Sequence, residues 1–158
     1  MIEKIINQDG LKAWLKEHRT EADKLVFTNG CFDVIHAGHV SCLAAAKSCG
    51  SLLIVAVNDD ASVKRLKGSN RPINFLEDRM TVLSAMTAID AVVSFSEDTP
   101  LSLIKTIMPD VLVKGGDYTI DEIVGASEVK AHGGQVVIVP TKEGFSSTSI
   151  IEKISNQS

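Results

Sequence analysis

The chain has 158 residues, a formal net charge of −4, and hydrophobic and charged contents of 44% and 23%. This length predicts one domain with a substantial core, and the acidic balance argues against general nucleic-acid binding. No apolar run approaches the roughly twenty residues that cross a bilayer, and the N-terminal stretch lacks the apolar centre of a signal peptide. We therefore expect a cytoplasmic protein with no nucleic-acid or membrane partner.

Predicted helices and strands alternate along the chain. In chain order, the patterns predict a helix over 9–19, a strand over 25–28, a helix over 38–49, a strand over 52–57, a short helix over 59–66, a loop over 67–75, a helix over 76–87, a strand over 91–95, a helix over 100–108, a strand over 111–113, a helical segment over 120–131, a strand over 135–139, a loop over 141–147 and a helix over 149–154.

Five parallel strands with crossover helices predict an α/β fold, a Rossmann-like doubly wound sheet. We expect a single domain over 1–158, with an N-terminal helix in 1–24 and the core in 25–158. Ligands of such sheets bind beyond the carboxyl ends of the strands. The polar and glycine-rich segments 28–39, 58–60, 114–118 and 141–148 all follow predicted strand ends, so the site is expected at that edge.

The segment 28–39 carries the densest chemical signal. It places His36 and His39 around Gly38 at the start of a predicted helix. Residues three apart on a helix have β-carbons roughly 5–6 Å apart, and helix starts offer unpaired N–H groups that suit phosphate. A pair of solvated surface histidines is the plain alternative. Zinc is a second alternative, but it needs three or four protein ligands. With no third His or Cys at a familiar spacing, we expect no protein metal site.

Three further segments point to phosphate or nucleotide. Neither a P-loop nor a G-x-G-x-x-G motif is present. A basic stretch holds Lys64, Arg65, Lys67 and Arg71, with Arg79 on the next helix, although each could be a solvated charge or a surface ion pair. The segment 114–118 combines two glycines with an acid and a tyrosine, but a plain turn would do the same. Four consecutive hydroxyl residues, 146–149, precede the last helix, where one would suffice as a cap.

These motifs resemble those of a known enzyme superfamily. His36-Ala37-Gly38-His39 matches the H-x-G-H signature of the nucleotidyltransferases, and the hydroxyl run resembles their second signature. More narrowly, residues 28–33, Lys67-Gly68 with Arg71-Pro72, 113–118 and 143–148 resemble the adenylyltransferases of ADP-heptose biosynthesis, in a form that is not fused to a sugar kinase. Those enzymes transfer AMP from ATP to D-glycero-β-D-manno-heptose 1-phosphate.

The resemblance implies roles for particular residues. His36, His39 and Lys67 are the expected catalytic residues. The expected nucleotide-binding set is Thr28, Asn29, Gly30, Phe32, Gly38, Lys114, Gly115, Asp117, Tyr118, Ser146, Ser147 and Thr148. Asp33, Asp60, Arg65, Arg71 and Arg79 are weaker candidates for the sugar phosphate. The resemblance also implies Mg²⁺ carried by the phosphates of ATP, and a homodimer.

Two alternatives stay open. The glycerol-3-phosphate cytidylyltransferases share the architecture, but their R-T-x-G-I-S-T-T run begins with an arginine that segment 140–148 lacks, which weakens the reading of CTP as substrate. A non-catalytic nucleotide sensor on the same fold is the alternative of another class. Retention of both histidines and of the hydroxyl run argues against it.

Overall fold

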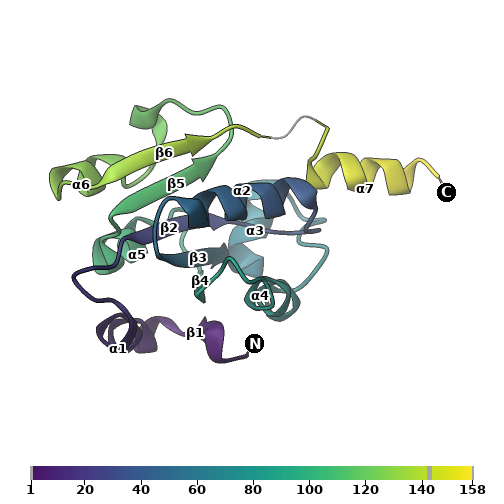
Figure 1. Cartoon of the computed structure of the whole chain (residues 1–158). Helices are drawn as coiled ribbons and strands as arrows, with labels where there is room; N and C mark the ends of the chain where they lie inside the picture. Colours follow the sequence, from purple (N-terminus) through teal and green to yellow (C-terminus); the bar gives the residue numbers. More distant parts are fainter. Residues whose placement is uncertain (1, 142–143, 158) are drawn as a thin grey trace.

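The computed structural model describes residues 2–141 and 144–157 (Figure 1). Its elements, in chain order, are η1 (Ile2–Lys4), β1 (Ile5–Ile6), α1 (Gln8–His18), β2 (Leu25–Gly30), α2 (Ala37–Ser48), β3 (Leu52–Asn58), α3 (Asp60–Lys67), α4 (Leu76–Ser84), β4 (Ala91–Phe95), α5 (Leu101–Ile107), β5 (Val111–Gly115), η2 (Ile120–Glu122), α6 (Ala126–Ala131), β6 (Gln135–Val139) and α7 (Ser147–Ser155).

The described strands form one parallel sheet in the order β1-β4-β3-β2-β5-β6. The predicted doubly wound α/β fold is confirmed, but the predicted strand number of five is wrong, because the sheet has six. The extra strand, Ile5–Ile6, pairs with Val92 and Val93 at the edge of the sheet. Two residues are too short to show the alternation that marks a strand in sequence.

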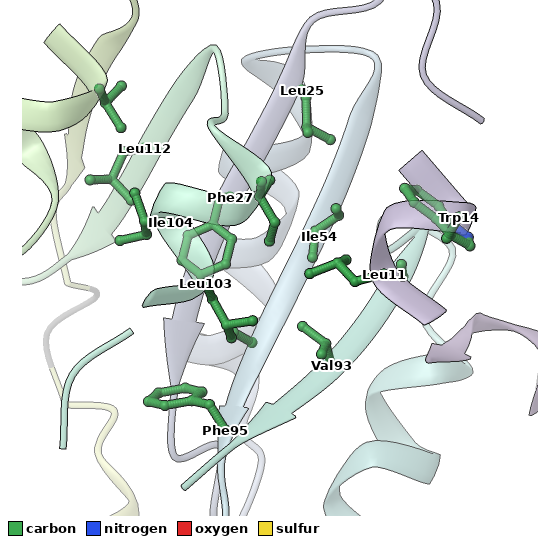
Figure 2. Packing of buried hydrophobic residues seen from close by; sticks show 14 of the residues in the cluster. Leu11, Trp14, Leu25, Phe27, Ile54, Val93, Phe95, Leu103, Ile104 and Leu112 are labelled. Atoms are coloured by element: carbon green, nitrogen blue, oxygen red, sulfur yellow. The ribbon is translucent and has the colours of Figure 1, made fainter. Parts of the chain in front are cut away.

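The strands alternate their side chains between two apolar layers. In β2, Leu25 and Phe27 pack on one side with residues of α1, α5 and α6. Val26 packs on the other side with Leu43 of α2 and Leu83 of α4. Successive side chains of a strand point to opposite faces, and a parallel sheet covered on both faces reads as a continuous apolar run. Figure 2 shows the first of these layers, where Leu11 of α1 points toward Ile54 and Val93.

The strand order reverses at β2. From β2 the chain moves outward to β3 and β4, and it then crosses back to place β5 on the other side of β2. The carboxyl ends of β2 and β5 therefore flank the switch point at which such sheets bind ligands. Both strands run two residues further than predicted, to Gly30 and Gly115. The sequence motifs that begin there are thus held by the sheet itself.

Helix boundaries differ from prediction at several places; α4, for example, ends at Ser84 rather than at residue 87. The predicted helical segment 120–131 is divided into η2 and α6 by Gly125, whose φ of +87° lies in the left-handed region. α7 starts at Ser147 rather than at residue 149, because the Ser146 hydroxyl caps it by accepting from the Ser149 N–H. Within the described chain, each helix is too short or too polar to cross a lipid bilayer.

Candidate active site

A pocket of about 670 Å³ opens at the carboxyl edge of the sheet, over the ends of β2 and β5. It brings together most residues that the sequence singled out. Those that line it are Thr28, Asn29, Gly30, Phe32, Asp33, His36, Gly38, His39, Lys67, Arg71, Lys114, Gly115, Tyr118, Ser146, Ser147 and Thr148. The predicted site residues outside its lining are Asp60, Arg65, Arg79 and Asp117.

The two histidines hold each other and the start of α2 in place. His36 is the N-cap, and its Nδ1 accepts a hydrogen bond from the Gly38 N–H at 3.0 Å. The Nδ1 of His39 accepts from the backbone N–H of His36 at 3.2 Å. The ring centroids lie 3.9 Å apart. Because each Nδ1 accepts a hydrogen bond from a backbone N–H, a neutral ring carries its proton on Nε2. Two Nε2–H donors are therefore left for a ligand.

Both imidazoles are neutral near pH 7. Burial lowers the pKa of His36. Burial, and secondly the charge of His36, lower the pKa of His39 from its usual 6.5 to about 4. The pair can therefore offer a ligand two hydrogen-bond donors rather than positive charge.

The structure gives a steric reason for glycine at position 38, which the sequence did not show. A β-carbon at this position would lie 2.8 Å from Cε1 of His36 and 3.0 Å from Cβ of Phe145. The ring of Phe145 lies beside that of His36, with centroids 6.2 Å apart. Gly38 thus leaves room for the close packing of His36 against the segment that leads into α7.

The four hydroxyls before and within α7 divide their roles. Ser146 caps the helix, and the Ser149 hydroxyl donates back to the Ser146 carbonyl at 2.9 Å. The Ser147 hydroxyl donates to the carbonyl of Asp33, which fixes the start of α7 against the segment after β2. The start of α7, with its N–H groups and Thr148, therefore lines the same pocket as the histidine pair.

Asp33 does not offer its carboxylate to the pocket. Its side chain is fully buried, and its Oδ2 accepts from Nε of Arg71 at 2.8 Å. The backbone N–H groups of Ile73 and Asn74 donate to the same carboxylate, at 2.7 and 2.9 Å. Burial opposes ionisation, but these hydrogen bonds and the Arg71 charge together lower the pKa of Asp33. The contact of Asp33 with sugar or metal-bound water stays a prediction; in this structure the carboxylate is engaged by segment 71–74.

Arg79 is also a structural residue. It is 1% exposed, and its guanidinium donates to Asp60 at 2.8 Å. It also donates to the backbone carbonyls of Cys31, Asn58 and Asn74. It therefore ties together the ends of β2 and β3 and the loop before α4. The substrate contacts predicted for Arg79 and Asp60 stay predictions; in this structure the two side chains pair with each other, and neither lines the pocket.

Of the remaining basic residues, three line the pocket and one does not. Arg65 pairs at 2.8 Å with Asp98 and does not itself line the pocket, and its substrate contact stays a prediction. Arg71 lines the pocket while paired with Asp33. Lys67, at the end of α3, is exposed. Lys114, in β5, is half-buried, and burial lowers its pKa.

The pocket also contains residues that the sequence argument passed over. Cys31 and Cys42 line it, and burial raises the pKa of both thiols. Cys42 lies three residues after His39, on the same face of α2, and that spacing could have placed it. Phe145 falls within segment 143–148, and the packing of its ring beside His36 is a tertiary contact without a sequence signal.

No group of three or more His, Cys, Asp or Glu side chains that could hold a metal ion occurs in residues 2–141 and 144–157. Two carboxylates that line the pocket already have partners, since Asp98 pairs with Arg65 and Glu122 accepts from the Thr119 N–H. The described side chains therefore do not form a cage for Mg²⁺. They are compatible with Mg²⁺ held by ligand phosphates and water.

The chain is similar to a known protein family and to several known proteins. The profile of the family described as Cytidylyltransferase-like matches residues 27–153. Two curated relatives, both named "Bifunctional protein HldE", come from Ectopseudomonas mendocina and Azotobacter vinelandii. They are 54% and 53% identical over 97% of this chain, which covers 32% of their length. The chain thus spans about a third of the curated relatives that it matches.

Two solved structures share the fold. A lipopolysaccharide core biosynthesis protein from Thermoplasma volcanium is 28% identical, with a TM-score of 0.62, and the match covers 76% of this chain and 97% of that one. Pantoate-beta-alanine ligase from Francisella tularensis, solved with a β,γ-ATP ligand and β-alanine, is 15% identical, with a TM-score of 0.63. That match covers 97% of this chain and 76% of the ligase, and it shows likeness of fold alone.

Proposed function

Because the chain belongs to the Cytidylyltransferase-like family and is a nucleotidyltransferase, we propose that it transfers AMP from ATP to D-glycero-β-D-manno-heptose 1-phosphate. The products are ADP-heptose and pyrophosphate, and the product serves the supply of heptose for lipopolysaccharide or another surface glycan. The resemblance of its motifs to the ADP-heptose adenylyltransferases supports this substrate. The relatives named bifunctional, of which it spans about a third, support it further.

The proposal rests mainly on the hydrogen bonds by which the side chains of His36 and His39 cap the start of α2. Backbone hydrogen bonds hold both Nδ1 atoms, so both Nε2–H groups are left as donors at the edge where the strand order reverses. The start of α7 lines the same pocket with further N–H groups and hydroxyls. Together these groups supply donors for a triphosphate without needing a P-loop.

The reaction is a displacement at the α-phosphorus of ATP. An oxygen of the sugar phosphate forms a bond to that phosphorus, and the bond to the bridging oxygen of pyrophosphate breaks in line. Such transfer depends mainly on positioning and on stabilising the negative charge that develops. In this proposal His36 and His39 donate to the α-phosphate and the bridging oxygen, Lys67 lies over the phosphates, and the start of α7 binds the β- and γ-phosphates. Tyr118 and Asp117 bind adenosine.

Mg²⁺ would be held by the ATP phosphates and by water, and it would supply positive charge that offsets part of the charge of the leaving pyrophosphate. In this proposal the chain acts in the cytoplasm and forms a homodimer. Sedimentation of the purified chain at micromolar concentration tests the dimer, and a mass of one chain contradicts it.

A cytidylyltransferase acting on glycerol 3-phosphate is the second candidate, which the family description favours. The test is pyrophosphate release with each pairing of ATP or CTP with heptose 1-phosphate or glycerol 3-phosphate. Release with ATP and heptose 1-phosphate, together with the mass of ADP-heptose, supports the proposal. Release only with CTP and glycerol 3-phosphate overturns it in favour of the second candidate. Nucleotide binding without release in any pairing indicates a sensor.

A further inference from the structure

Lys114 is the one lysine in the lining of the pocket that is both half-buried and without an acidic partner among the described residues. The charges of the other cationic side chains that line the pocket are compensated by a carboxylate or by solvent. Arg71 is paired with Asp33, and the exposed Lys67 is solvated by water. Lys114 has instead the ring of Tyr118, whose centroid lies 5.5 Å from its Nζ. A cation–π contact at this distance offsets only part of the cost of burying an ammonium group.

The immediate surroundings of Lys114 do not compensate its charge. The titratable groups that act on it are Cys31, Cys42 and Lys67. Burial raises the pKa of both thiols, so they are protonated and neutral near pH 7. Lys67 carries the same charge as Lys114 and repels it. A ligand that closes this pocket removes still more water from Lys114, and only an anionic ligand group would balance the charge. Adenine and ribose are neutral, whereas a phosphate is not.

The position of Lys114 indicates which phosphate it meets. Cys42 packs against Gly115, next to Lys114, and lies one turn of α2 beyond His39, about 5 Å further from the helix start. The proposed pyrophosphate position is at the other end, by the starts of α2 and α7. An in-line displacement requires the attacking oxygen to approach from the side opposite the leaving group. If the triphosphate binds as proposed, Lys114, which lies next to Gly115 and Cys42, faces that side.

We propose that Lys114 binds the phosphate group of the acceptor, a phosphate monoester on a sugar. This assignment rests on the proposed function for the chemical class of the acceptor. It differs from the adenosine contact that the sequence resemblance implies for the segment 114–118. In this arrangement Lys114 neutralises the charge of the incoming phosphate and reduces its repulsion from the α-phosphate of ATP. His36, His39 and the start of α7 remain responsible for ATP.

The experiment measures the binding of each substrate separately by isothermal titration calorimetry. Heptose 1-phosphate is titrated into protein saturated with α,β-methylene-ATP and Mg²⁺, and ATP is titrated alone. Lys114→Met is expected to weaken heptose 1-phosphate at least tenfold and to change ATP binding less than twofold. Lys114→Arg is expected to bind the acceptor within about threefold of the wild type. Lys12→Met, at an exposed position on α1, is the matched control and is expected to change neither.

The proposal is overturned if Lys114→Met weakens ATP and leaves the acceptor unchanged, or if it changes neither. Circular dichroism of Lys114→Met and Lys114→Arg verifies the fold, and Lys114→Arg keeps the test valid if the Met variant does not fold. Failure of the proposed function is detected separately, by measuring pyrophosphate release by the wild type. If the wild type binds the sugar phosphate through Lys114 but releases no pyrophosphate, the proposed function fails and the assignment of Lys114 stands.

Discussion

His36 and His39 have two roles that a simple alanine substitution would confuse. Each Nδ1 satisfies a backbone N–H at the start of α2, and each Nε2–H is left for the ligand. Loss of an N-cap costs about 1 kcal/mol of stability, whereas loss of a group that stabilises the transition state costs about 10²–10⁴ in turnover. Variants that keep one role and remove the other separate them.

His36→Asn keeps an oxygen that can cap α2 and removes the Nε2–H donor. We predict a turnover about 10²–10⁴ lower than that of the wild type, with the free energy of unfolding within about 1 kcal/mol. Pyrophosphate release and urea unfolding measure the two quantities. His132→Asn, at an exposed position after α6, is the control and should match the wild type. Near-normal turnover of His36→Asn would remove His36 from the catalytic set.

The low pKa of His39 makes stability depend on pH. Between its usual pKa of 6.5 and its value of about 4 in the fold, the unfolded chain binds a proton that the native chain does not. The free energy of unfolding therefore falls as the pH decreases from 6.5 to 4, and this loss ends below 4. We predict that His39→Gln has a shallower decrease between pH 7 and pH 5, measured by urea unfolding. A slope equal to that of the wild type would contradict the assigned pKa.

At the scale of elements, Asp33 connects the strand ends to the loop that carries Arg71. Its backbone carbonyl accepts from Ser147 of α7, and its carboxylate accepts from segment 71–74. Phe32 and Val34, on either side, have positive φ angles of 51° and 53°. Such backbone is costly for residues with side chains. These contacts hold the strained segment in the conformation that presents His36.

Replacing Asp33 with Ala removes an acceptor for three donors. We predict a loss of about 2–4 kcal/mol in the free energy of unfolding at pH 7, and faster amide hydrogen exchange at Ile73 and Asn74. The lowered pKa of Asp33 gives the sign of the pH effect: its contribution is complete above its ordinary value of 3.8 and is lost as the pH falls through the lower native value. Asp121→Ala, at an exposed position in η2, is the control. Unchanged exchange at Ile73 would contradict this role.

The sequence predicted those helices and strands whose pattern of apolar residues reflects their place in the fold. Apolar runs placed β2 to β6, and the H-x-G-H spacing placed the pocket at the start of α2. β1 escaped prediction because a two-residue edge strand is defined only by its pairing with β4. The sequence did not show the protein partners of Arg79, Asp60 and Arg65, because a charged residue looks the same in sequence whether it faces a ligand or another side chain. Only the fold shows that Arg79 has four acceptors of its own.

At the scale of the whole molecule, the N-terminal helix belongs to the same core as the sheet. Leu11 and Trp14 of α1 pack in one apolar cluster with Phe27 of β2 and Ile54 of β3 (Figure 2). Helix α1, in the segment predicted as an N-terminal helix beside the core, thus contributes side chains to that core. This shared packing agrees with the predicted single domain, and the cooperativity of unfolding tests that prediction.

Leu11→Ala removes a side chain that is 1% exposed. We predict a loss of about 2–5 kcal/mol in the free energy of unfolding, with far-ultraviolet and near-ultraviolet circular dichroism changing in one transition. Lys12→Ala, the exposed neighbour, should change stability by less than about 0.5 kcal/mol. An early, separate transition of α1 would show that the helix is not part of the cooperative unit.

The central claim is that the paired imidazoles and the start of α7 hold one triphosphate. A crystal structure with α,β-methylene-ATP and Mg²⁺ tests it most directly. We predict that Nε2 of His36 and of His39 lie within hydrogen-bond distance of phosphate oxygens, and that backbone N–H groups at the start of α7 bind the β- and γ-phosphates. A nucleotide bound elsewhere, with both Nε2 atoms beyond the reach of any phosphate oxygen, would contradict the claim.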